Sequence, residues 1–214
     1  MITTPELIDA LAAGAKPVRR LRPPLVRTGL WLFLAAAVFV LLALSRGARP
    51  DLAQQLAQPV FAVGLVASLA TGVLAALASF LVSLPDRSRA WMLLPVPPLV
   101  IWVSTVSYGC LTNWVDIGAN GIRLGEAANC FATLMLTSLP LSIALFVMLR
   151  FAAWFRPTAV TLTGSLAVAA MTATALSFFH AFDATIMILV WNLGIGAIIV
   201  GLGSALGIRA RAVA

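Results

Sequence analysis

Long apolar stretches separated by short polar segments dominate the chain from residue 28 onward. Each stretch is close to the ~20 residues that a helix needs to cross the hydrocarbon core of a membrane. Because lipid offers no partner to an unpaired backbone group, stretches of this length are expected to be helical. The pattern predicts an all-α integral membrane protein, a six-helix bundle spanning 28–207 and followed by a short tail at 208–214. The expected spans are 28–44, 60–84, 91–108, 131–149, 158–179 and 184–206.

The first 27 residues are the one sizeable segment with a different pattern. Thr4 followed by Pro5 is typical of a helix start, because threonine can cap and proline is tolerated in the first turn. Apolar residues then recur at helical spacing, which predicts a short amphipathic helix in water. The stripe consists of Leu7, Ile8, Leu11 and Ala12.

Two interpretations fit this helix. It lies flat on the lipid surface, or it offers Leu7, Ile8 and Leu11 to a groove on a partner protein. Glu6 and Asp9 would be poorly placed beside anionic lipid. The acids therefore favour a protein partner.

Basic residues orient the predicted bundle. The chain has a net charge of +7, but only 10% of its residues are charged, and the arginines flank apolar runs instead of forming a face for nucleic acid. With the amino terminus inside, eleven Lys and Arg residues fall on the inner side and three on the outer side, which predicts that both termini are cytoplasmic. The inner set is Lys16, Arg19, Arg20, Arg22, Arg27, Arg87, Arg89, Arg150, Arg156, Arg209 and Arg211; the outer set is Arg46, Arg49 and Arg123.

This orientation gathers four chemically active residues on or near the outer face: Cys110, Cys130, His180 and Asp183. The cysteines either form a redox pair in an oxidising periplasm or are two unrelated residues packed in helix ends. One histidine without ligand spacing does not predict a metal site. His180 fits the headgroup region, and Asp183 fits a cap on the following helix. The four residues are candidates for receiving a signal.

The spans carry no charged residue near their middle, although Pro95, Pro97, Pro98 and Pro140 should interrupt two of them. Transporters usually need a charge at that depth. No catalytic constellation is visible, so we expect no enzyme, no cofactor and no metal. Small residues four apart favour close helix packing and offer a route to oligomers. These pairs are Ser165 with Ala169 and Gly203 with Gly207.

Short motifs in a fixed order carry a family resemblance. They are TPELIDALAAG (Thr4–Gly14), PVRRLRP (Pro17–Pro23), ARPDL (Ala48–Leu52), Cys130 at the start of the fourth span, SLPL (Ser138–Leu141) and FHAFDATIMILVWNLG (Phe179–Gly194). In this order the chain resembles the NrsF-like membrane anti-sigma factors, six-span negative regulators of extracytoplasmic-function sigma factors. The resemblance implies that the cytoplasmic head holds a sigma factor at the bacterial inner membrane. It also implies that a periplasmic signal, in some relatives acting through cysteines, releases it.

The chain departs from this family at one position. The family's second cysteine follows the tip histidine, where this chain has Ala181. A disulfide from Cys130 to the tip is therefore impossible. Cys110 replaces the missing partner, or this protein senses another signal, or the cysteines are not the sensor. Two other classes of function remain: a small transporter or channel subunit, and a thiol–disulfide oxidoreductase using Cys110 and Cys130, although no CxxC pair is present.

Overall fold

The computed structural model describes residues 3–13, 22–47, 49–112, 124–149, 156–179 and Gly194. Within these residues all regular structure is helical, and five helices are long and apolar enough to cross a membrane. Of the sixth expected span, 184–206, only Gly194 is described. The helices are α1 (Thr4–Ala13), α2 (Pro24–Arg46), α3 (Leu52–Leu56), α4 (Pro59–Val82), the 3-10 helix η1 (Arg89–Leu93), α5 (Val96–Thr112), α6 (Leu124–Leu149) and α7 (Pro157–Phe179).

Two spans begin earlier than the apolar pattern predicts. α2 begins at Pro24, where the missing amide of proline costs nothing, and it takes in residues expected to lie in the head. α6 begins at Leu124, so the last part of the expected outer loop is helical instead of forming a cap. Hydropathy alone underestimates both helices.

Prolines interrupt the third span as predicted. The stretch divides into η1 and α5, with the buried Pro95 between them. Pro97 and Pro98 lie in the first turn of α5, where no amide is needed. Pro140, in contrast, lies inside α6 without ending it.

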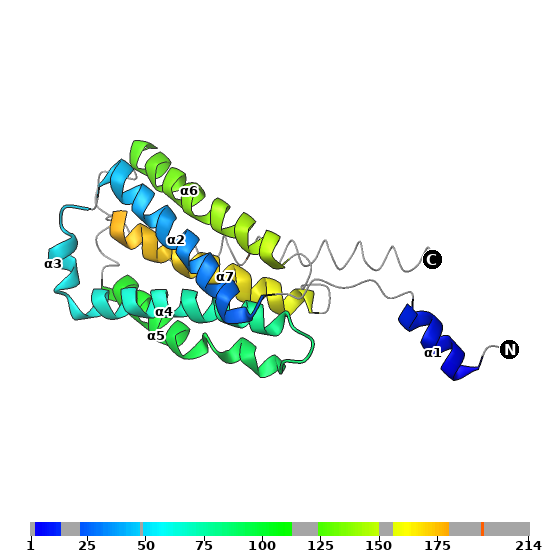
Figure 1. Cartoon of the computed structure of the whole chain (residues 1–214). Coiled ribbons are helices and arrows are strands. Elements are labelled where there is room, and N and C mark those ends of the chain that lie inside the picture. The colour runs from blue at the N-terminus through cyan, green and yellow to red at the C-terminus, as the bar shows by residue number, and fades with distance from the viewer. Residues whose placement is uncertain are drawn as a thin grey trace.

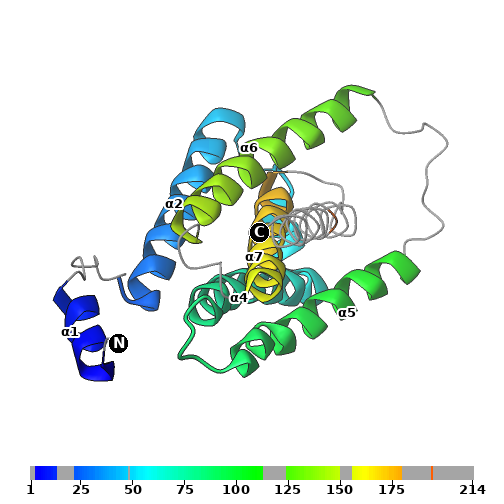
Figure 2. The same ribbon diagram turned by 90° about the vertical axis from the view of Figure 1, so that its right-hand side faces the viewer.

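The central helix of the bundle is α7. It packs against α2, α4 and α6, while α5 packs on the outside of α4 (Figures 1 and 2). Thirteen of its residues are buried, including an unbroken run from Ala167 to Leu176. A helix surrounded in this way needs no polar face, which explains why its apolar and small residues show no periodicity.

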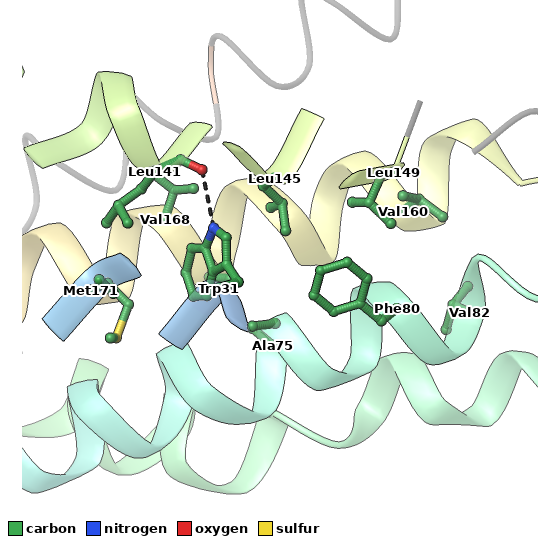
Figure 3. Close-up of a cluster of buried hydrophobic side chains, with 13 residues drawn as sticks. Trp31, Ala75, Phe80, Val82, Leu141, Leu145, Leu149, Val160, Val168 and Met171 are labelled. Carbon is green, nitrogen blue, oxygen red and sulfur yellow. Dashed lines mark hydrogen bonds between the residues drawn. The ribbon is translucent and has the colours of Figure 1, made fainter. Parts of the chain in front are cut away.

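The main core lies where α2, α4, α6 and α7 meet (Figure 3). Trp31 from α2 and Phe80 from α4 are its largest side chains, and both are fully buried. Small residues let the helices approach closely. A Cβ added at Gly72 of α4 would lie 2.7 Å from the sulfur of Met171 in α7.

Hydroxyl groups supply the polar contacts at depth. The hydroxyls of Ser68 in α4 and Thr174 in α7 are 2.9 Å apart and fully enclosed. Most other buried hydroxyls bond to carbonyls one turn back in their own helix, as Thr71 does to Ala67. Such bonds satisfy a polar group in an apolar interior without introducing charge.

Candidate functional site

The first candidate site is α1, which lies outside the bundle in both views (Figures 1 and 2). Every side chain of α1 whose exposure the structure describes is exposed, including Ile8 at 60%. Leu7 and Leu11 are in the same helix, but their side chains are not among those described. Arg19 and Arg20 lie outside the described residues. A large apolar side chain is therefore presented on a helix that the bundle does not cover.

The start of α1 is held by its own residues. The backbone amide of Thr3 donates to Glu6 Oε2 at 2.8 Å, which satisfies one of the unpaired donors at a helix start. This bond to the Thr3 backbone is the main cause of a lowered pKa for the Glu6 carboxyl. The helix begins at Thr4 itself, one position earlier than a cap at Thr4 would imply.

Arg27, in the first turn of α2, attaches this helix to the rest of the bundle. Its guanidinium Nη2 donates to the backbone carbonyl of Met148, and its Cζ lies 4.7 Å from the centre of the Phe80 ring. Met148 is next to the last described residue of α6. Although Arg27 was expected in the solvated head, it is only 5% exposed. One side chain thus joins the start of α2 to the ends of α6 and α4.

Trp31 continues this attachment one turn further along α2. Its indole Nε1 donates to the carbonyl of Leu141 at 3.1 Å, and the side chain is fully buried (Figure 3). Because residues four apart lie on the same face of a helix, Arg27 and Trp31 attach a single side of α2 to α6.

The same end of the bundle, which we call the head end, collects the starts of α2 and α7 and the ends of α4 and α6. Arg156, just before α7, donates Nη1 to the carbonyl of Arg87 at 2.7 Å and Nη2 to that of Pro85 at 3.3 Å. These bonds tie the loop after α4 to α7. The described basic residues at the head end are Arg22, Arg27, Arg87, Arg89 and Arg156.

The opposite end, which we call the far end, is held by Arg49 and Asp51 between α2 and α3. Arg49 Nε and Nη2 donate to the two oxygens of Asp51 at 2.7 and 2.6 Å, the bidentate geometry that is strongest for this pair. The bonds from Arg49 lower the pKa of Asp51 to about 2, and they raise that of Arg49. The amide of Arg49 donates to the carbonyl of Phe178 in α7 at 3.1 Å, and its guanidinium faces Phe61 at 5.9 Å.

The predicted signal-receiving residues are placed only in part. Cys110 lies two residues before the end of α5, and Cys130 lies six residues into α6 instead of at its start. Figure 2 shows these two helices on opposite sides of α7. The side chains of both cysteines, and the whole of His180 and Asp183, are outside the described residues. Their pairing and chemistry stay predictions.

Sequence reasoning missed both arginine attachments. The sequence pattern predicts for Arg27 and Arg49 a role in orienting the chain. A local signal for each attachment exists: an arginine one turn before a tryptophan in the first span, and the Arg-Pro-Asp order within the ARPDL motif. Neither signal predicts which distant carbonyl accepts the hydrogen bond, and for Arg27 this carbonyl lies 121 residues away in the sequence.

The comparisons with known proteins give one match. The NrsF family, described as negative regulator of sigma F, matches residues 11–211, nearly the whole chain. No curated protein and no solved structure matches the chain. Because the match begins at Leu11, Leu7 and Ile8 precede the matched range.

Proposed function

The chain belongs to the NrsF family of negative regulators of sigma F, and on this premise we propose that it is a membrane-bound anti-sigma factor. The proposed partner is an extracytoplasmic-function sigma factor, held by residues 1–27 and released on a periplasmic or membrane stress signal. In this role the protein is a regulator without catalytic function, and it does not contact nucleic acid directly.

One observation carries the proposal: α1 is exposed and lies outside the bundle, while the helix that follows it is fixed by Arg27. An apolar helix face that docks in a groove is a common mode of partner recognition. Leu7, Ile8 and Leu11 form the proposed contact. Arg19 and Arg20 add attraction to an acidic surface of the sigma factor, which favours fast association.

The test compares two single charges on the same helix. Ile8→Asp places a carboxylate in the proposed contact, and we expect it to abolish co-purification of the sigma factor. Leu7→Asp/Leu11→Asp should have the same effect. Ala13→Asp adds an equal charge on the opposite side of α1, at another exposed position, and should leave recovery unchanged.

Ala13→Asp also controls for a weakened helix, because an acid in the last turn of a helix opposes the helix dipole and destabilises the helix slightly. If Ala13→Asp retains the sigma factor and Ile8→Asp loses it, the loss comes from the apolar face and not from added charge or unwinding. Equal recovery with Ile8→Asp and with the unmodified chain would refute the contact.

The proposed location is the bacterial inner membrane, with both termini in the cytoplasm. Five helices long and apolar enough to span a membrane support an integral membrane protein. The excess of arginine at the head end of the described bundle supports an inward-facing head. This orientation brings α1 to the side of the membrane where a sigma factor is found.

The proposed signal enters at the far end, where Cys110, Cys130, His180 and Asp183 are expected. Since Ala181 replaces the tip cysteine, a thiol switch in this protein would require Cys110 and Cys130 to pair. Peptide mapping under non-reducing conditions after oxidant treatment tests this step. Two free thiols would exclude the switch and leave the anti-sigma activity itself untouched.

Association between copies is proposed only through the face of Gly203 and Gly207. The other small-residue pair is occupied within the chain, because Ala169 is fully buried in α7. The lipid bilayer surrounds the bundle. Exposed apolar side chains such as Phe33 at 76% and Leu44 at 80% on α2 fit contact with lipid.

A further inference from the structure

We propose that α2 transmits the state of the far end to the head, through an attachment at each of its ends. We call the attachment by Arg49 and Asp51 the far clamp and the attachment by Arg27 the head clamp. The inference rests on the proposed function for its biological consequence, but its structural content is independent of any sigma factor. It gives a role to the ARPDL motif, which the proposed function leaves unused.

The far clamp joins the segment that follows α2 to the described end of α7. The amide of Arg49 donates to the carbonyl of Phe178 at 3.1 Å. Asp51 fixes the Arg49 side chain with two short hydrogen bonds and starts α3 immediately afterwards.

The Phe178 carbonyl that accepts from Arg49 is two residues before His180, which opens the predicted outer tip. Gln55 adds a weaker contact to Asp51 at 3.5 Å, which makes the clamp part of the turn and not an isolated pair.

The head clamp lies at the other end of α2. There the guanidinium of Arg27 donates to the carbonyl of Met148 in α6 and lies over the ring of Phe80 in α4. In the first turn of α2, the amide of Arg27 donates to the carbonyl of Pro23. A neighbouring helix thus holds the chain at or close to each end of α2.

Between the clamps α2 is a continuous helix of 23 residues without an internal proline. At 1.5 Å per residue it is about 35 Å long. One face is buried along this length by Trp31, Ala35 and Leu42. Closely packed helices shift between discrete arrangements and do not deform continuously, so loss of one attachment should be felt at the other.

The experiment weakens the far clamp by a small change in the side-chain pairing that fixes Arg49. Asp51→Asn removes the charge that orients Arg49 but keeps the size of the side chain, and Asp51 is 42% exposed, so the chain should still fold. Asp86→Asn is the matched control. It makes the same substitution in an exposed pair with Arg87 at 3.7 Å, at the head end but outside the clamps. Arg49→Lys is a second variant, which keeps the charge and loses the bidentate geometry.

The measurement is hydrogen–deuterium exchange of the purified full-length chain without sigma factor. We expect Asp51→Asn and Arg49→Lys to raise exchange at 24–31 and at 145–149 roughly fivefold, the factor that a modest loss of local stability produces. Asp86→Asn should change neither segment. A rise confined to 46–60 and 176–179 would overturn the inference, because the far end would then open without effect on the head. An equal rise in every helix would overturn it too, since it would report general destabilisation.

Recovery of the sigma factor from the same variants gives the functional consequence. Asp51→Asn should release a larger share than Asp86→Asn does. If even the unmodified chain retains no sigma factor, the proposed function fails, while the exchange data still decide whether the clamps communicate.

Discussion

Arg27 is the fourth residue of α2, and its guanidinium reaches the Met148 carbonyl of another helix. Burying a charge is costly unless the group is paired, and here the partners are this carbonyl dipole of α6 and the face of Phe80. The head end of a membrane bundle is close to water and headgroups, which lowers this cost. Arg27 therefore attaches α2 to α6 and α4, in addition to any part it has in orienting the chain.

Replacing Arg27 by alanine should destabilise the bundle. The substitution removes the hydrogen bond to the Met148 carbonyl and opens space beside Phe80, a loss of about 1–3 kcal/mol. The apparent melting temperature in detergent should fall clearly for Arg27→Ala and hardly at all for Arg87→Ala. The Arg87 side chain forms an exposed pair with Asp86 at 3.7 Å, and such pairs contribute about 0–1 kcal/mol. The Arg87 carbonyl, which accepts from Arg156, is unchanged by the substitution. Equal melting temperatures for Arg27→Ala and the unmodified chain would contradict this role.

Glu6 makes the stability of the start of α1 depend on pH. Its pKa in the folded helix is lowered from 4.5 by the bond from the Thr3 amide, so the stabilisation is fully present above 4.5. It is lost as the pH falls through the lowered value, where protonation weakens the acceptor. NMR titration of the Glu6 carboxyl should give a midpoint below 4.5, and the Thr3 amide shift should follow the same curve. In Glu6→Gln the Thr3 amide should show no such transition, and a Glu6 midpoint at or above 4.5 would argue against the bond.

At the scale of elements, α4 and α7 form the largest helix–helix contact, and Gly72 lets the two helices approach closely because it has no side chain. A side chain at this position meets Met171, whereas nothing lies within 4 Å of the Cβ position of Gly29 on α2. Gly72→Val and Gly29→Val change helix propensity equally but differ in space. We expect Gly72→Val to reduce the stability of the bundle by about 1–3 kcal/mol through overpacking, and so to lower the melting temperature. Gly29→Val should have little effect. The reverse order would show that the α4–α7 contact is loose.

The sequence predicts the elements well because membrane helices need long apolar runs whatever their place in the bundle. The runs at 60–84 and 158–179 match α4 and α7 within two residues at each end. For the same reason, hydropathy does not predict which helix is central, since it does not distinguish contact with lipid from contact with protein. The many threonines of α7 were an unused clue, because hydroxyls that bond back to their own helix suit a buried span.

The candidate site was predictable to the extent that it is local. An isolated stripe and a threonine–proline start predict α1, and α1 spans Thr4–Ala13. The clamps were not predictable, because each joins an arginine to a backbone carbonyl, and every residue carries a carbonyl. Only the fold decides that the carbonyls of Met148 and Phe178 lie within reach of Arg27 and Arg49.

At the scale of the whole molecule, the two ends of the bundle differ in charge. Of the described basic residues, five lie at the head end and two, Arg46 and Arg49, at the far end. Since positive residues are retained in the cytoplasm, the asymmetry supports the proposed orientation with α1 inside. The proposed function requires this orientation, because a head facing the periplasm would never meet a sigma factor.

Single cysteines test the orientation directly. In a Cys110→Ser/Cys130→Ser background, Ala57→Cys reports on the far end and Ala90→Cys on the head end, both at exposed positions outside the long helices. In intact cells a membrane-impermeant maleimide should label residue 57 and not residue 90. Ala13→Cys should behave like Ala90→Cys, and both should react once the cells are lysed. Labelling of residues 13 and 90 in intact cells would place the head outside and remove the basis for sigma-factor binding, whatever the pull-down gives.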